Sequence, residues 1–345
     1  EVEYKGEIFS GSDILKKMKW EVIELVSKEG LALLNGTQNM NAFAVWALLQ
    51  SERLSEWADI IGTMSLEAYD GRIEPFTHAV HAVRHHKGQI DTAARIRELL
   101  EGSELIKQPK VNVQDPYSFR CMPQVHGASK DTIAYVKSVV DIEVNAATDN
   151  PTVCPDEDLV ISAGNFHGEP IAQPMDFLAI ALCELSNISE RRIYKLVSGT
   201  RNLPSFLVAK PGVNSGFMIP QYTAASIVSQ SKTYCTPASV DSIPSSQGQE
   251  DHVSMGTIGA RKARTIVDHA QHVLSIELLC AAQAADFWDS KNLGVGTKEA
   301  YRTLREKVDF MENDVIFYPL MDKSFEIIKD AILLANVEKI VGLLK

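Results

Sequence analysis

The sequence lacks the long hydrophobic runs and paired cysteines that mark membrane and disulfide-rich proteins. In its 345 residues, apolar runs such as 177–183 fall far short of the ~18 consecutive apolar residues of a membrane-spanning helix. The five cysteines are scattered and include no Cys-x-x-Cys pair, which argues against a disulfide framework or a zinc site and favours reduced thiols. We therefore expect a cytoplasmic protein without a membrane partner.

Basic charge is also scarce. The chain has 34 lysines and arginines against 45 aspartates and glutamates, a formal net charge of −11, so nucleic acid is not an expected partner. Phosphate-binding glycine loops, Gly-x-Ser-x-Gly elbows and dinucleotide fingerprints are absent, which argues against serine hydrolysis and hydride transfer. His78, His81, His85 and His86 have helical spacing, but no carboxylate or cysteine motif accompanies them, so we expect no metal site.

Helical spacing of apolar residues dominates what the sequence does contain. Three stretches, 38–69, 169–197 and 252–288, are far longer than the mean helix of ~11–12 residues, so they must pack against one another. Shorter helical candidates are 12–25, 77–100, 131–145, 221–234, 298–310 and 324–344. Strand-like alternation is rare, and no repeat or flexible linker interrupts the chain. The sequence predicts a mainly α fold, a long-helix bundle forming one region over 1–345.

Four long loops separate these helices, and loops of such length are commonly functional. They are 107–130, 146–168, 198–220 and 236–251. In the first, an amide, a phenol and a guanidinium lie close together in Gln114, Tyr117 and Arg120. An arginine there can hold a carboxylate through two hydrogen bonds while the phenol handles a proton. The alternative is a surface loop with a structural salt bridge.

Three further positions have both a functional and a structural interpretation. Glu250 precedes a long helix, where it either exchanges a proton with a polar substrate group or caps the helix. Asn35 begins an Asn-Gly-Thr phrase that suits a binding loop or a tight turn. Phe166 lies between glycines, where an aromatic ring can stack on a ligand or cover the core.

Taken together, these phrases resemble those of the histidine ammonia-lyase family, within the wider aromatic amino acid lyases. The matching segments occur in order and span nearly the whole chain: 28–38, 114–121, 148–151, 164–170, 214–220, and 239–242 running into 249–255. The resemblance implies an all-helical bundle of the aspartase/fumarase-like and aromatic amino acid lyase type, with extended active-site loops. It also implies a homotetramer whose active sites take residues from more than one subunit.

The activity implied is the elimination of ammonia from the amino acid L-histidine to give trans-urocanate, a step of histidine catabolism. The family carries it out with 4-methylidene-imidazol-5-one, an electrophile formed from the protein itself. By the same resemblance, Arg120 binds the substrate carboxylate with help from Asn35, and Phe166 shapes the pocket. Gln114 and Tyr117 surround the electrophile and the amino group.

Glu250 is the clue to the substrate, because it would meet the imidazole or exchange a proton at the amino group. Phenylalanine- and tyrosine-directed relatives usually have an uncharged pattern there, and a buried carboxylate suits an imidazole N–H better than a phenyl ring. The alternatives are a phenylalanine or tyrosine ammonia-lyase, an aminomutase, or a catalytically inactive helical scaffold. A fumarase/aspartase-type lyase is disfavoured, because its Gly-Ser-Ser loop has no counterpart near 245–248.

One departure from the family is clear: the Ala-Ser-Gly tripeptide that forms the electrophile does not occur in the sequence. Each Ala-Ser pair, at 128–129, 225–226 and 238–239, is followed by a residue other than glycine. In the family, the tripeptide and the tyrosine usually assigned as the base precede the Asn-Gly-Thr phrase. We therefore expect this chain to be the C-terminal portion of a longer lyase, to need the N-terminal portion as a partner, and to be inactive alone.

Overall fold

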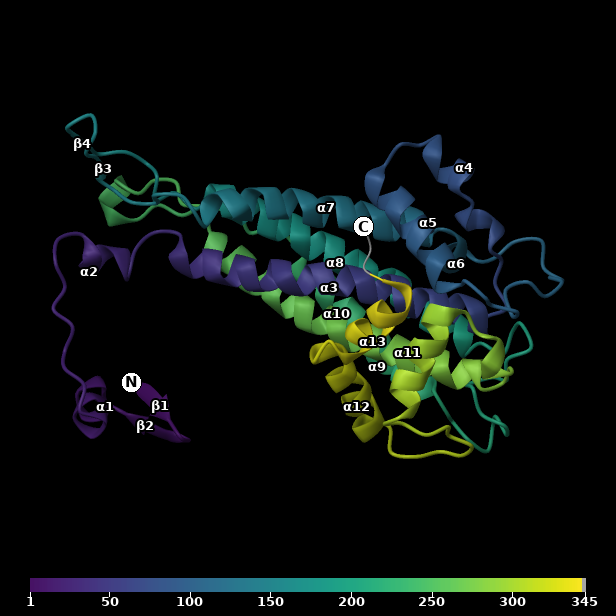
Figure 1. The fold of residues 1–345 in the computed structure, drawn as a ribbon. Coiled ribbons are helices and arrows are strands. Elements are labelled where there is room, and N and C mark those ends of the chain that lie inside the picture. Colours follow the sequence, from purple (N-terminus) through teal and green to yellow (C-terminus); the bar gives the residue numbers. More distant parts are fainter. Residues whose placement is uncertain (343–345) are drawn as a thin grey trace. The chain divides into compact units, whose positions relative to one another are not determined.

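A computed structural model describes residues 1–342, which are mostly helical and divide into two compact units (Figure 1). The smaller unit comprises residues 1–38 and 147–166, and the larger one comprises 39–146 and the chain from 167 onward. None of the helices in the described residues is both long and apolar enough to cross a membrane.

The smaller unit is built from two hairpins and two short helices. Its elements are β1 (Val2–Tyr4), β2 (Glu7–Phe9), α1 (Gly11–Met18), α2 (Glu29–Ala32), β3 (Thr152–Cys154) and β4 (Leu159–Ile161), with β1 antiparallel to β2 and β3 antiparallel to β4. Ser10 caps α1 by accepting a hydrogen bond from the backbone N–H of Asp13 at 3.1 Å. The helix predicted over 12–25 ends early, because Lys19 is left-handed and bonds back to the last turn.

The larger unit contains the long helices. Its elements are α3 (Gln38–Ala68), η1 (Glu74–Phe76), α4 (His78–Ala82), α5 (Lys87–Leu99), α6 (Tyr117–Arg120), α7 (Met122–Glu143), α8 (Glu169–Leu196), α9 (Met218–Tyr234), η2 (Ser246–Gly248), α10 (Gly256–Ala285), η3 (Ser290–Asn292), α11 (Val295–Arg305), α12 (Tyr318–Lys329) and α13 (Ile332–Val341). The three long predicted helices are confirmed as α3, α8 and α10. The predictions over 221–234 and 298–310 correspond to α9 and α11.

The remaining helix predictions are wrong in their bounds, for identifiable reasons. The helix predicted over 77–100 is two helices, α4 and α5, because His85 between them has a φ of 63°. The one over 324–344 divides at Ala331, whose φ is 56°, and residues 343–345 lie outside the described ones. α7 begins at Met122 rather than 131, with a proline in its first turn, so the predicted loop 107–130 is partly helical.

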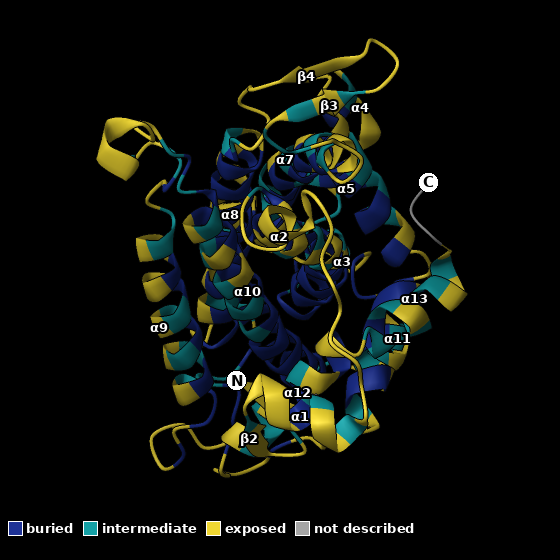
Figure 2. Ribbon diagram, turned by 90° about the vertical axis from the view of Figure 1, so that its left-hand side faces the viewer, coloured by how far each residue is buried: buried dark blue, intermediate teal, exposed yellow. Residues whose placement is uncertain are grey.

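The core lies between α3, α7, α8 and α10. Trp57, Ile61, Leu182 and Val273 are fully buried there, and each such side chain stabilises the fold by about 1.5–3 kcal/mol. In Figure 2 the buried residues follow the inner faces of these helices, whereas the outer face of α9 is exposed. The many alanines of α10 favour its 30-residue helix, and they outweigh the short β-branched run of Thr265, Ile266 and Val267.

The direction of the helices places the loops at two separate ends. Side chains from late in α3 and late in α8 both hydrogen-bond Glu277, late in α10, so these three helices run parallel. The start of α7 meets the later part of α3 through His126 and Asp59, so α7 runs the other way. α6 and the start of α7 therefore lie where α3 ends, and the starts of α8 and α10 lie where α3 begins, beside Met40 (Figure 1).

Candidate active site

Three predicted site residues line one cavity at the end of α3. The cavity measures about 440 Å³, and its lining residues are Tyr69, Asn112, Gln114, Asp115, Pro116, Tyr117, Arg120, Thr200 and Arg201. We call it the Arg120 cavity, and the end of the bundle that holds it the Arg120 end. The structure thus brings together the amide, the phenol and the guanidinium that the sequence places within one loop.

A single helical turn, α6, presents two of these side chains to the cavity. Pro116 fixes the backbone before the turn, and its carbonyl accepts hydrogen bonds from the N–H groups of Phe119 and Arg120, both at 3.1 Å. Phe119 points inward, is fully buried, and stacks on Tyr69 with ring centroids 4.4 Å apart. Because positions three apart share a helix face, Tyr117 and Arg120 point together, and Tyr117 is 71% exposed.

Arg120 has capacity to bind an anion. Its guanidinium lies 4.7 Å from the centroid of the Tyr117 ring, and its Nε is buried without a hydrogen-bond partner among the described residues. Arginine carries five N–H donors in a fixed fork, which matches the two oxygens of a carboxylate. Burial raises the pKa of the neighbouring Cys121 thiol, with Arg120 opposing the rise, so this cysteine is protonated at neutral pH and is a poor nucleophile.

Beneath α6 lies a buried charged network. Arg192 on α8 donates to both carboxylate oxygens of Glu277, at 2.5 and 2.8 Å, and all three side chains of Arg192, Glu277 and His126 are fully buried. Arg192 also donates to the Ser118 carbonyl within α6 at 3.5 Å. The turn that carries Tyr117 and Arg120 is therefore fixed to α8 and α10 from below.

His126 and Asp59 extend this network toward α3. Arginine cannot accept a hydrogen bond, so Nε2 of His126 must accept from Arg192 at 3.2 Å, which leaves Nδ1–H to donate to Asp59 at 2.8 Å. Burial lowers the pKa of His126, so the ring is neutral as this geometry requires. Burial alone would raise the pKa of Asp59, but Lys130 and His126 outweigh it and lower that pKa.

Glu250 lies at the other end of the bundle, which we call the Glu250 end. It is exposed, its carboxylate accepts a hydrogen bond from the Ser245 hydroxyl, and its carbonyl accepts from the Ser245 N–H at 2.9 Å. Nearby, the rings of His167 and His252 stack with centroids 5.5 Å apart. Met255 is the N-cap of α10, so Glu250 does not cap that helix.

The helix that separates the two ends also sets the distance between them. α3 has 31 residues, which at 1.5 Å per residue gives about 45 Å. The side chain of Met40, in the first turn of α3, packs against Gly168 and Gly256 at the starts of α8 and α10. It lies so close that a Cβ at either glycine would clash with its sulfur. Glu250 and Arg120 of one chain are therefore too far apart to contact the same amino acid.

Asn35 and Phe166, the other two predicted site residues, belong to the smaller unit. Asn35 is exposed and its N–H donates to the Leu31 carbonyl at 2.7 Å. Phe166 is 46% exposed, so it does not cover a core within that unit. Lys28 pairs with Asp149 at 2.7 Å, which joins two of the segments that carry the family resemblance.

Sequence reasoning missed Tyr69 and Arg201, which also line the Arg120 cavity. The loop 198–220 was expected to be functional, but no motif within it pointed to Arg201. Among the described residues, no group of three or more histidines, cysteines and carboxylates could hold a metal ion. His81 is instead buried, with its ring nitrogens 2.9 Å from the Pro75 carbonyl and from Gln89, and burial lowers its pKa.

Comparison with known proteins places this arrangement in a family. The family model described as aromatic amino acid lyase matches residues 1–306. The chain belongs to the aromatic amino acid lyases. Among curated members of this family, histidine ammonia-lyase 2 of Fusobacterium nucleatum is 64% identical over all of this chain and 68% of its own length. Histidine ammonia-lyase of Alkaliphilus metalliredigens is 51% identical with the same coverage.

Solved structures of aromatic amino acid lyases share the fold. A histidine ammonia-lyase from Trypanosoma cruzi is 40% identical with a TM-score of 0.89, and the match covers 95% of this chain and 63% of that one. A tyrosine aminomutase from Streptomyces globisporus is 32% identical with a TM-score of 0.93, covering 99% and 69%. The predicted long-helix bundle is confirmed. Because the aminomutase superposes at least as well, the fold does not distinguish substrates, and sequence identity is the better guide.

Proposed function

We propose that this protein eliminates ammonia from L-histidine to give trans-urocanate, with its residues forming part of the complete active site. Two relatives named histidine ammonia-lyase, at 64% and 51% identity over the whole chain, support histidine as the substrate. The structural observation that carries the proposal is the Arg120 cavity, in which a guanidinium with an unpartnered buried Nε lies beside a phenol and an amide.

Arg120 is the carboxylate clamp in this proposal. Two parallel hydrogen bonds from one guanidinium fix the plane of the substrate carboxylate, and the contact of Arg120 with the Tyr117 ring limits its rotation. Asn35 adds an amide donor. Binding that fixes orientation lowers the entropic part of the barrier, so the clamp contributes to the reaction rate as well as to affinity.

The substrate amino group and β-proton need separate catalytic groups, because ammonia is a poor leaving group and the β-proton is only weakly acidic. Tyr117 and Gln114 border the cavity, where a phenol can exchange a proton and an amide can accept a hydrogen bond from the ammonium. Phe166 shapes the pocket around the ring. Glu250 accepts a hydrogen bond from the imidazole N–H, or takes a proton at the amino group.

The family electrophile, 4-methylidene-imidazol-5-one, activates the substrate for loss of ammonia when it is present. The residues here fit beside such a group, since Gln114 and Tyr117 are exposed and turn an amide and a phenol toward the cavity. The tripeptide that forms the electrophile is not among the 345 residues. We propose that a segment outside this sequence supplies it, together with a tyrosine that acts as base.

A complete site also requires more than one copy of the chain. Because Arg120 and Glu250 lie at opposite ends of α3, the Arg120 end of one copy must meet the Glu250 end of another. We propose a homotetramer, the assembly that the family resemblance implies. Exposed apolar side chains along α3, α8 and α9 support it, since faces of this kind are usually covered by a partner. Examples are Trp46, Leu49, Phe177, Ile180 and Tyr222.

Five free cysteines favour a cytoplasmic location.

The test is urocanate formation, followed by its ultraviolet absorbance. The 345-residue chain is assayed alone and after co-expression with the segment of the Fusobacterium relative that lies outside the match, and the mass of each assembly is measured. We expect turnover of L-histidine only in the co-expressed tetramer. L-Phenylalanine and L-tyrosine serve as substrate controls, and equal turnover of either would contradict histidine specificity. A co-expressed tetramer that converts none of the three would contradict the proposed function.

A further inference from the structure

Arg201 is a buried charged residue with a strained backbone conformation. It lies in the loop between α8 and α9, its φ is 59°, and the next residue, Asn202, has a φ of 65°. Two consecutive residues other than glycine in this left-handed region cost free energy, which the surrounding structure has to supply. The Arg201 side chain is nevertheless only 8% exposed. Such strain around a buried charge is typical of a functional site.

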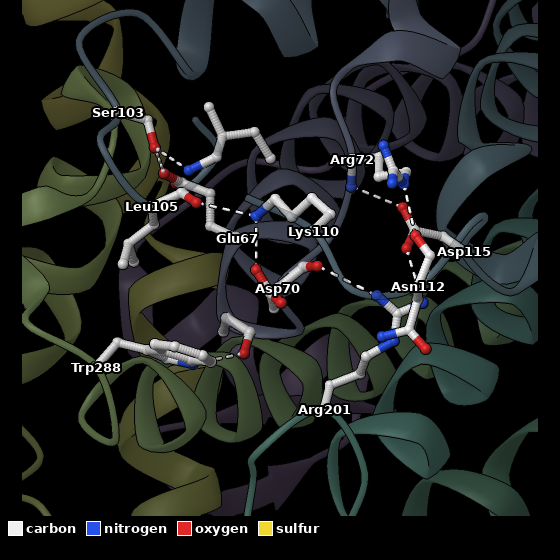
Figure 3. Close-up of polar contacts among 12 residues, drawn as sticks. Glu67, Asp70, Arg72, Ser103, Leu105, Lys110, Asn112, Asp115, Arg201 and Trp288 are labelled. Carbon is white, nitrogen blue, oxygen red and sulfur yellow. Dashed lines mark hydrogen bonds and ion pairs between the residues drawn. The ribbon is translucent and has the colours of Figure 1, made fainter. Parts of the chain in front are cut away.

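The guanidinium of Arg201 joins the end of α3 to the loop before α6 (Figure 3). Its Nη1 donates to the Asp70 carbonyl at 3.3 Å, and its Cζ lies 5.2 Å from the Tyr69 ring centroid. Its Nη2 donates to the Gln114 carbonyl at 3.1 Å and lies 3.1 Å from Oδ1 of Asp115. One side chain therefore fixes the backbone of a predicted catalytic residue and pairs with its neighbour.

Asp115 is the second half of this arrangement. Its side chain is fully buried, and its Oδ2 accepts a hydrogen bond from the Arg72 N–H at 2.7 Å. The Arg72 side chain in turn donates to the Asn112 carbonyl at 2.8 Å. Figure 3 shows Asp115 between Arg72 and Arg201, with a contact to each. The loop is thus held on both sides immediately before Pro116, the N-cap residue of α6.

We propose that Arg201 and Asp115 are a positioning pair that sets the place of Gln114 and of the turn carrying Tyr117 and Arg120. This inference rests on the proposed function for its effect on catalysis, but its structural part stands alone. The pair acts mainly through the backbone, since its hydrogen bonds are to the Gln114 and Asp70 carbonyls and the Arg72 N–H. A displacement of about 1 Å at reacting groups can lower a rate by up to about a hundredfold.

The structural part is tested by hydrogen exchange on the 345-residue chain. Arg201→Gln removes the charge and shortens the side chain, whereas Asp115→Asn removes the charge with almost no change of shape. Asp115→Asn is therefore the milder change if Arg201→Gln folds poorly. We expect the α6 amides of Phe119 to Cys121 to exchange about ten- to a hundredfold faster, as the loss of a hydrogen bond to a charged group predicts. Unchanged exchange in both variants would overturn the proposal, whatever their activity.

A matched control is the Arg305–Asp286 pair, whose side chains are 13% and 16% exposed and which touches no residue of the Arg120 cavity. Arg305→Gln should leave exchange in α6 unchanged. A similar increase there would show that any lost arginine–aspartate pair loosens α6, which would overturn a specific role for Arg201.

The catalytic part is tested on the co-expressed tetramer with L-histidine. We expect Arg201→Gln and Asp115→Asn to lower kcat by about ten- to a hundredfold with a smaller change in KM, and the double variant to lose about as much as the worse single one. Arg201→Lys should restore little, because one ammonium cannot replace the fork. An unchanged kcat in a tetramer that turns over histidine would overturn the proposal. Absence of wild-type turnover would contradict only the proposed function, since the exchange result is independent of it.

Discussion

The two ends of the helical bundle hold the side chains proposed for the active site in different ways. At the Arg120 end, exposed Tyr117 stands on a buried network of charges from α3, α7, α8 and α10. At the Glu250 end, exposed Glu250 is held by a few hydrogen bonds within its own loop. In our proposal, the Arg120 end binds the carboxylate that all amino acid substrates share, and the Glu250 end meets the ring that differs between them. Constant chemistry is thus built into the core, and variable chemistry lies on a loop that can change without unfolding the protein.

The largest effect expected at the Arg120 end comes from Arg192→Met. The change leaves Glu277 as a buried carboxylate without its cation, which destabilises proteins by about 3–5 kcal/mol. Urea unfolding followed by circular dichroism measures it. Arg261→Met, an exposed arginine near the start of α10, is the control and should change stability by less than about 0.5 kcal/mol. Equal losses in both variants would remove the contrast between the two ends.

A second effect at the Arg120 end depends on pH. Burial raises the pKa of Glu67 to about 7 from an ordinary value of 4.5, against lowering by hydrogen bonds from Ser103, Thr297 and the Gly294 N–H. Between these pH values the unfolded chain has released the proton that folded Glu67 keeps, so stability falls as pH rises. Glu67→Gln should remove about 3 kcal/mol of this fall between pH 4.5 and 8.

The measurement is urea unfolding of the wild type and of Glu67→Gln across that pH range. Glu250→Gln is the control, since it removes an exposed carboxylate at the other end. A Glu67→Gln curve parallel to that of the wild type would show that burial of Glu67 has no such cost.

Arg120→Lys should affect activity without affecting folding. A lysine keeps the charge but offers no pair of parallel donors. We expect transition-state stabilisation to fall by about 2 kcal/mol, which lowers kcat/KM for L-histidine roughly thirtyfold. Steady-state kinetics of the assembled enzyme checks this, with unfolding measured alongside. An unchanged kcat/KM would remove Arg120 from the clamp role and leave the Arg120 end without its main binding group.

Glu250→Gln should give the smallest effect, and a selective one. Loss of one charged hydrogen bond to the imidazole is expected to raise the activation free energy by about 1.4 kcal/mol, which lowers kcat/KM for L-histidine roughly tenfold. Stability should change by less than about 0.5 kcal/mol, because Glu250 is exposed. Any residual turnover of L-phenylalanine should fall less, and equal losses on both substrates would remove Glu250 from specificity.

Sequence alone predicts the long helices well, because their apolar spacing persists for about eight turns. It fails where single residues take left-handed conformations, as His85 and Ala331 do, because neither residue type predicts the end of a helix. It also groups Gln114, Tyr117 and Arg120 correctly, since one short loop contains all three. It does not reveal that Glu250 lies at the far end of α3, which depends on helix direction.

Arg201 marks a different limit of sequence reasoning. Its role comes from contacts to backbone carbonyls that are distant in the sequence, and such contacts leave no motif. Asn35 and Phe166 illustrate the opposite case: the family resemblance predicts them as site residues, and the structure places them in the smaller unit. A sequence motif can therefore indicate a residue without indicating which groups that residue contacts.

The 31-residue span of α3 has a consequence for inheritance. In the proposed tetramer each copy gives its Arg120 end to one site and its Glu250 end to another. A cell with one allele damaged at Arg120 and a second damaged at Glu250 assembles mixed tetramers, in which some sites draw both ends from undamaged positions. Two alleles that are each inactive alone then complement one another, whereas two alleles damaged at the same end do not.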